Sequence, residues 1–184
     1  MLIGIMGRKY SGKDTIANYL SAKYGYQKIA FAEPLKKSCQ VMFQFTDEQL
    51  EEDKEVVDEY WGITPRQVFQ YIGTDVVRNG MENLIPGIGN DFWLNSGMKK
   101  YHSLRDNGIK TVISDVRFPN ELERIHKEGG VVIKVTRLSL ENSDSHASET
   151  QTDEMVGDYL ITNDFDFDSL YEKIDSIVSG LNKI

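Results

Sequence analysis

The sequence feature that most constrains the fold is a run near the start of the chain, GRKYSGKDT over residues 7–15. It follows the short apolar run LIGIM and precedes residues with helical spacing, so it lies where a strand turns into a helix. G-x-x-x-x-G-K followed by Ser or Thr is the pattern of a phosphate-binding loop, in which backbone N–H groups and a helix N-terminus converge on an anion. This run departs from the pattern at Asp14, where a hydroxyl that binds Mg2+ is expected.

The substitution at Asp14 is compatible with a working loop. Lys13 would reach the β- and γ-phosphates of a nucleotide, and Thr15 could still offer its hydroxyl and its amide to a phosphate. Asp14 could hold Mg2+ directly or through a bound water, because this ion prefers oxygen ligands and keeps several waters. The competing interpretation is an ordinary strand-to-helix turn that contains Gly-Lys by chance. Agreement of the loop, the lysine and both flanking elements favours the functional loop.

Apolar runs and stretches with helical spacing alternate along the chain. Alternating strands and helices imply an α/β fold, with a mainly parallel sheet covered by helices on both faces. Together with the loop, this pattern predicts a three-layer P-loop NTPase fold with five strands, in a single domain over residues 1–184. The stretch 46–60 is too charged to be buried, so we expect a solvated helix or a flap there. The expected strands cover residues 2–6, 27–32, 110–118, 131–137 and 158–164; the longer expected helices cover 13–24, 64–78, 90–108 and 167–181.

Composition narrows the classes of function. The formal net charge of −8 argues against broad binding to nucleic acid or to an anionic membrane. Cys39 is the single cysteine, so no internal disulfide can form, and its apolar surroundings favour a buried thiol in a reducing compartment. His146 has no second ligand at zinc spacing. No signal peptide or spanning helix fits the sequence, and we therefore expect a cytoplasmic protein.

Five sequence pieces carry a family resemblance: GKDT, AEPLK, RQVFQYIGTD, SDVRFPNE and ITND. Their order and spacing resemble the deoxynucleoside monophosphate kinases of large bacteriophages, especially the T-even type, over nearly the whole chain. The resemblance implies an adenylate-kinase-like fold that transfers the γ-phosphate of ATP to a deoxynucleoside monophosphate, with Mg2+. It also implies a viral or phage origin, action in the host cytoplasm, an acceptor-binding helical region at about 33–105 and a lid-like loop at about 138–156. GKDT is this family's own form of the loop.

The resemblance assigns a donor side to the site. Arg137, at the end of VVIKVTR, would face the ATP phosphates or the adenine, and Asn163 in ITND would lie near the adenine. Asp14 would be the Mg2+ ligand, directly or through water. The residues that match the family's phosphate-binding loop are Gly7, Gly12, Lys13, Asp14 and Thr15.

The acceptor side is likewise implied by matching motifs. Arg66 would clamp the acceptor phosphate, for which the planar fork of arginine is suited. Trp93 could stack on the acceptor base, although burial in a core is an equally good interpretation. Lys54 matches only loosely. The remaining implied acceptor contacts are Lys9, Leu35, Lys36, Gly73 and Thr74.

Asp115 and Arg117 lie at the carboxyl end of the best strand of the chain, where open α/β sheets bind ligands. Asp115 would position the acceptor or a Mg2+-bound water, and Arg117 would stabilise charge on the transferring phosphate. Lys13, Arg66, Asp115 and Arg117 are thus the implied catalytic group. Glu121 matches an acidic residue near the acceptor, with simple decoration of a helix surface as the alternative.

Two other functions fit parts of the pattern. Animal-type phosphomevalonate kinases resemble the GKDT, TPR, GT and DVRFPNE pieces, and their acceptor is also a phosphate monoester. A regulator that binds ATP without transferring phosphate would need no second phosphate clamp, so Lys13 and the several arginines argue against it. The expected partners are small-molecule nucleotides, with neither nucleic acid nor membrane, and a homodimer is compatible with the family.

Overall fold

The computed structural model describes residues 1–137, 152–163 and 166–181. The chain forms two compact units: unit 1 contains Met1–Ala30 and Lys100–Ile184, and unit 2 contains Phe31–Lys99. Most of the expected lid-like loop, including His146, lies outside the described residues, and only its end from Thr152 onward is described.

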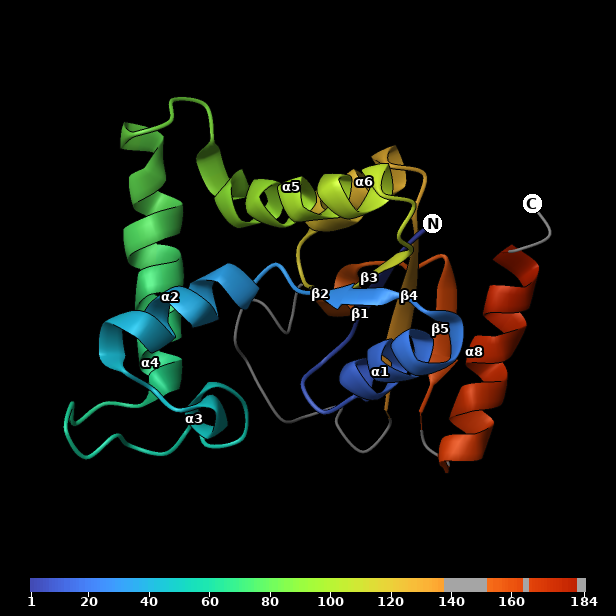
Figure 1. The fold of residues 1–184 in the computed structure, drawn as a ribbon, viewed down its shortest axis with the longest axis horizontal. Helices are drawn as coiled ribbons and strands as arrows, with labels where there is room; N and C mark the ends of the chain where they lie inside the picture. Colours follow the sequence, from blue (N-terminus) through green and yellow to red (C-terminus); the bar gives the residue numbers. More distant parts are fainter. Residues whose placement is uncertain (138–151, 164–165, 182–184) are drawn as a thin grey trace. The chain divides into compact units, whose positions relative to one another are not determined.

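Unit 1 is built on a five-stranded sheet with the order β2-β3-β1-β4-β5 (Figure 1). All its strand pairs are parallel, which confirms the predicted fold class. The central strand β1 is buried along its whole length, as expected for a parallel strand covered on both faces. The strands are β1 (Leu2–Met6), β2 (Gln27–Ile29), β3 (Thr111–Val116), β4 (Val131–Thr136) and β5 (Tyr159–Thr162).

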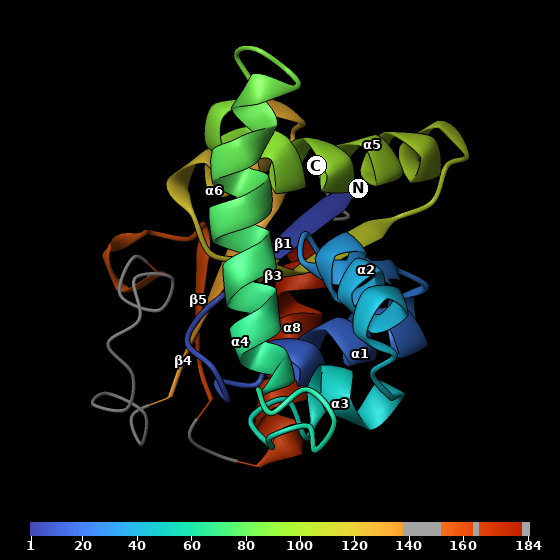
Figure 2. The same cartoon turned by 90° about the vertical axis from the view of Figure 1, so that its left-hand side faces the viewer.

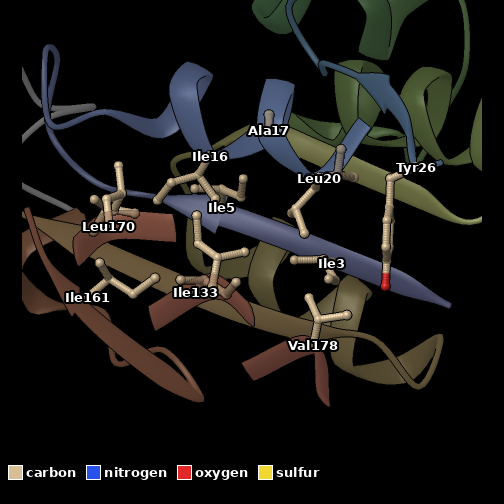
Figure 3. Packing of buried hydrophobic residues seen from close by; sticks show 13 residues of the cluster. Ile3, Ile5, Ile16, Ala17, Leu20, Tyr26, Ile133, Ile161, Leu170 and Val178 are labelled. Atoms are coloured by element: carbon tan, nitrogen blue, oxygen red, sulfur yellow. The ribbon is translucent and has the colours of Figure 1, made fainter. Parts of the chain in front are cut away.

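Successive residues of β1 point to opposite faces of the sheet. Ile3 and Ile5 pack with Ile133 of β4 in a fully buried cluster (Figure 3). This cluster is closed by α1 (Lys13–Tyr24) and α8 (Phe167–Leu181).

The other face of the sheet is covered by α6 (Pro119–Lys127), so that α1 and α6 lie on opposite sides of the strands (Figure 1). A Cβ atom at Gly4 would lie 2.6 Å from Cδ1 of Ile125, which shows how closely α6 approaches β1. Helices on both faces therefore bury the sheet that carries the glycine-rich loop.

The two helices of the first face are joined by Asp175 of α8. Its carboxylate accepts hydrogen bonds from the hydroxyls of Tyr19 and Tyr24, at 2.9 and 2.7 Å, and from Nζ of Lys23 at 2.7 Å. These hydrogen bonds, chiefly the one from Lys23, hold the pKa of Asp175 below its usual value. The C-terminal helix thus fixes α1, which begins at the loop.

Unit 2 is helical. Its core contains Leu35, Cys39, Phe45, Leu50 and Val68. The predicted burial of Cys39 is confirmed, and burial raises the pKa of its thiol to about 11. The elements are α2 (Glu33–Phe43), α3 (Asp47–Glu51), α4 (Pro65–Gln70), the π-helix η1 (Tyr71–Arg78), the 3-10 helices η2 (Met81–Asn83) and η3 (Gly89–Asp91), and the first turns of α5 (Phe92–Asp106).

Three elements differ from the expected ones. The second strand ends at Ile29, because Ala32 already caps α2. The charged stretch 46–60 is helical only over α3; beyond it the carboxylate of Asp58 accepts the N–H groups of Tyr60 and Trp61 and holds a turn. The helix expected over 64–78 is present, but it continues from α4 into η1 as one ribbon (Figure 2). No helix among the described residues is long and apolar enough to span a membrane.

We expect Ile133→Ala to lower the free energy of unfolding by about 2–5 kcal/mol, because it leaves a cavity in the fully buried cluster. Leu160→Ala on the neighbouring strand is the matched control, since Leu160 is 66% exposed and its loss should cost about 0.5 kcal/mol or less. Urea unfolding followed by circular dichroism measures both. Equal losses for the two variants would contradict the assigned core.

Candidate active site

The candidate site lies at the carboxyl ends of the strands of unit 1. Because all the strands run in one direction, these ends meet at one edge of the sheet, where open α/β folds bind ligands. Strand β1 continues there into the loop 7–12. On one side of β1, Asp115 is the next-to-last residue of β3 and Arg117 directly follows that strand; on the other side, Arg137 follows β4. Asn163 follows β5, so the structure brings these predicted residues to the same edge as the loop.

The loop is packed so closely that glycine is required at both its ends. Gly7 has φ 151°, and a Cβ atom there would lie 2.3 Å from the carbonyl oxygen of Val135. Gly12 has φ 102°, and its Cβ would lie 2.4 Å from Nδ2 of Asn163. That amide in turn donates a hydrogen bond of 2.8 Å to the carbonyl of Ser11. Asn163 therefore holds the loop in this structure.

Lys13 is held across the loop. Its side chain is buried, and Nζ donates to the carbonyl oxygens of Gly7 at 2.8 Å and Arg8 at 2.6 Å. The ammonium group is thereby fixed at the first turn of α1, with its charge inside the loop. A cation placed in advance, at low local dielectric, interacts strongly with an incoming anion.

Ser11 is a loop residue that the sequence analysis did not single out. It is 1% exposed, and among the described residues its Oγ has no hydrogen-bond partner. A buried hydroxyl in a phosphate-binding loop can donate to an anion, which fits the function inferred from the motif. Its signal in the sequence is its place directly before Gly-Lys.

Asp14 faces away from the core of the loop. Its carboxylate is 77% exposed and lies 2.7 Å from Nζ of Lys28 on β2, a partner that was not predicted. No group of three or more potential metal ligands occurs among the described residues. A site with the single carboxylate of Asp14 still fits Mg2+, because this ion keeps several waters and needs only one or two carboxylates beside the phosphates of a substrate. Thr15, the next residue of α1, is half-buried.

Glu121 stabilises the turn after β3. It is 4% exposed, so decoration of a helix surface is wrong as an account of it. Its Oε2 accepts the backbone N–H groups of Arg117 at 2.7 Å and Phe118 at 3.1 Å. A carboxylate at this position also suits the positive end of α6. Glu121 therefore fixes the backbone that carries Arg117.

The outer part of the loop is formed by Lys9 and Tyr10. Tyr10 has φ 64°, its side chain is 70% exposed, and Nζ of Lys9 lies 4.8 Å from the centre of its ring. The carbonyl of Tyr10 accepts a long hydrogen bond of 3.5 Å from Nη1 of Arg137. Arg137 is thus close to the loop, as the donor-side prediction requires.

Within unit 2, three of the predicted acceptor residues lie together. A Cβ atom at Gly73 would lie 2.6 Å from Cδ2 of Leu35, and the indole N–H of Trp93 donates to the carbonyl of Gly73 at 2.9 Å. Trp93 is half-buried against the core of unit 2. Packing against this core is therefore part of its environment.

The charged acceptor residues of unit 2 are paired with carboxylates. Nζ of Lys36 lies 2.6 Å from Glu51, and Nε of Arg66 lies 3.4 Å from Glu55. The backbone N–H of Arg66 donates to the carbonyl of Lys54 at 2.9 Å. Thr74 is exposed on η1. Both cations are thus held in unit 2 by acidic residues of the segment that follows α2.

The family model for deoxynucleotide monophosphate kinase matches the chain in two overlapping stretches, residues 1–63 and 41–174. A protein of Acanthamoeba polyphaga mimivirus, provisionally named a deoxynucleotide monophosphate kinase, is 37% identical over 191 residues, which cover all of this chain and 99% of that protein. The deoxynucleotide monophosphate kinase of Escherichia phage RB69 is 30% identical over 71% of this chain and 50% of its own length. The corresponding enzyme of Enterobacteria phage T4 is 25% identical over 68% of this chain and 48% of its own length.

Solved structures support the fold independently. A dephospho-CoA kinase from Campylobacter jejuni superposes with a TM-score of 0.56 at 11% identity, over 99% of this chain and 97% of that one. This likeness shows the fold alone. The phosphate-binding loop lies at the edge of the sheet where ligands bind, and the sequence relatives belong to the family that the motifs indicated. The chain therefore belongs to the deoxynucleotide monophosphate kinase family.

Proposed function

We propose that this protein transfers the γ-phosphoryl group of ATP to the phosphate of a deoxynucleoside monophosphate, giving ADP and the deoxynucleoside diphosphate. The observation that carries the proposal is the loop after β1, where Lys13 is fixed by two loop carbonyls in a chain of this family. Relatives named for this activity support it.

The chemistry requires positioning and charge stabilisation more than a base. The attacking group is a phosphate oxygen that is already ionised, so no strong base needs to remove a proton. Lys13 would neutralise charge on the β- and γ-phosphates, and Arg117 would do so on the transferring group. Asp115 would orient the acceptor. The buried Glu121 serves this arrangement by fixing the backbone of Arg117.

A bound Mg2+ would supply positive charge that offsets the negative charge of the ATP phosphates. Asp14 and Thr15, in the first turn of α1, would hold the ion directly or through its waters. The exposed carboxylate of Asp14 can leave Lys28 for an ion at little cost, because exposed ion pairs contribute little free energy.

Within unit 2, Arg66 would clamp the phosphate of the acceptor, and Lys36 would reduce repulsion between the phosphates of the substrates. In unit 1, Lys9 would also offset phosphate charge. Gly73 and Thr74 would approach the nucleotide, and Trp93 would stack on its base. Stacking tolerates different bases, which suits an enzyme that accepts several of them. Lys54 would be a further acceptor contact; its backbone carbonyl accepts the N–H of Arg66.

We further propose that the enzyme acts in the cytoplasm of a host cell, without a nucleic-acid partner. The viral and phage relatives and the single buried Cys39 support this setting. Pairing of two copies is part of the same proposal.

The proposed function predicts ADP release from ATP and Mg2+ that depends on a deoxynucleoside monophosphate. Each deoxynucleotide, each ribonucleotide and phosphomevalonate are supplied in turn, and ADP is measured by a coupled assay. ADP release with phosphomevalonate alone would mean that the acceptor is phosphomevalonate and not a deoxynucleotide. ATP binding without ADP release for any acceptor would instead favour a regulator.

Lys13→Ala should lower kcat by about 100-fold or more, because it removes a fixed charge next to the transferring phosphate. Lys127→Ala, on the exposed end of α6, is the matched control and should keep full activity. Circular dichroism of both variants checks the fold. Retention of most activity by a folded Lys13→Ala variant would contradict the assigned role.

Arg66→Ala should raise KM for the deoxynucleotide by about 10-fold or more, since it removes a charge-assisted hydrogen bond to phosphate, while KM for ATP stays unchanged. Arg66→Lys should restore only part of the affinity, because lysine lacks the planar fork. Arg105→Ala, an exposed arginine of α5, serves as the control. A rise in KM for ATP instead would place Arg66 on the donor side.

A further inference from the structure

The second residue of the phosphate-binding loop, Arg8, is tied to a residue far along the chain. Its Nε lies 3.0 and 3.2 Å from the two carboxylate oxygens of Asp153, and Nη2 lies 2.5 Å from Oδ2. Both residues belong to unit 1. The guanidinium and the carboxylate thus meet in a forked pair, the arrangement with the most defined geometry for these two groups.

Asp153 is held in place by its own surroundings. Nζ of Lys134 donates to the carbonyl oxygens of Asp153 and Met155, both at 2.7 Å. The neighbouring side chains of Thr152 and Met155 are 1% and 8% exposed. The backbone that carries the carboxylate is therefore fixed to β4 and to the core, unlike that of a typical surface ion pair.

The contacts around Asp153 lead back to the loop from two directions. Lys134 lies opposite Met6 in the register of β4 and β1, directly before Gly7. Arg8 offers its carbonyl oxygen to Nζ of Lys13 at 2.6 Å while its side chain binds Asp153. The orientation of the Arg8 peptide, and with it one of the two anchors of the Lys13 ammonium, is thus linked to the carboxylate of Asp153.

The carboxylate is charged under ordinary conditions. The hydrogen bond from Arg8 is the largest influence on it and holds the pKa of Asp153 below its usual value, with a further contribution from the charge of Lys134. The pair is partly exposed, with 25% of the Arg8 side chain and 43% of the Asp153 side chain accessible. A partly exposed pair of this kind contributes little to the stability of the fold, so its main effect is to orient the side chain of Arg8.

We propose that Asp153 is a positioning residue for the donor site: it holds Arg8 and, through Arg8, sets the loop conformation that receives the phosphates of ATP. The inference rests on the proposed function, because it concerns the same loop. It adds a residue that lies 145 positions from its partner and belongs to none of the motifs that identify the family.

The test compares ATP affinity, measured by titration calorimetry with Mg2+, among the wild type and the variants Asp153→Asn, Arg8→Ala and the double variant. Asp153→Asn should raise Kd for ATP by about 3- to 5-fold, the range of a partly exposed ion pair. Kd in the double variant should equal that of Arg8→Ala, because Asp153 acts through Arg8. KM for the deoxynucleotide should stay unchanged.

Glu154→Gln is the matched control. It removes the same charge from the adjacent, exposed position, so its Kd for ATP should equal that of the wild type. Raising the ionic strength should reduce the difference between Asp153→Asn and the wild type, since salt screens exposed pairs. Thermal unfolding verifies that every variant is folded.

Each other outcome overturns the inference. Unchanged ATP affinity in Asp153→Asn would make the pair irrelevant to the loop, and tighter binding would mean that Asp153 competes with phosphate for Arg8. Additive effects in the double variant would show that Asp153 acts by another route. Failure of the proposed function is distinguishable, because a protein that binds ATP but releases no ADP with any acceptor still permits the comparison of affinities.

Discussion

The close packing of the loop against the ends of β4 and β5 is the constraint on which the rest of the site depends. A side chain at Gly7 would collide with the backbone of Val135, and one at Gly12 would collide with Asn163. These contacts are possible because β1 is the central strand of a parallel sheet, so that β4 beside it and β5 beyond β4 end at the same edge. The glycines therefore serve the packing of the loop before any ligand is considered, and the loop is shaped by its surroundings as well as by its own sequence.

A loop fixed from outside can fix the charge inside it. The carbonyl oxygens of Gly7 and Arg8 hold the Lys13 ammonium, and they can do so because the backbone to which they belong is restrained by neighbouring strands. The amide of Asn163 restrains the other end at Ser11. Groups held in this way need little reorganisation when charge moves during phosphoryl transfer, which is the main source of electrostatic stabilisation in such reactions. For the same reason, the ion pair between Arg8 and Asp153 would affect ATP affinity, because it restrains one of the two carbonyl groups that hold Lys13.

The sequence predicted the parts of the molecule that have a local signal. Strands β1, β3 and β4 stand out in the sequence as largely apolar runs, because both faces of a parallel sheet are buried. The helix over 64–78 was expected, but its change to a π-helix at Tyr71 has no counterpart in the spacing of apolar residues.

The pairs Asp14–Lys28 and Arg8–Asp153 were missed because they join different elements, and only the order of strands in the sheet brings them together. Glu121 was singled out in the sequence as an acceptor-side residue, but its burial could not be foreseen, because it depends on the turn that follows β3.

The two interpretations of Trp93 are compatible. Its indole N–H is used within unit 2, since it donates to the carbonyl of Gly73 and ties the start of α5 to η1. Stacking on a base uses the face of the ring and not the N–H, so a structural hydrogen bond leaves that property intact. It also fixes the plane of the ring, and a platform that is already oriented loses less conformational freedom when a base stacks on it. A tryptophan placed in this way can accept different bases, because every base offers a flat face, and the proposed phosphate contact of Arg66 would be the same for each of them.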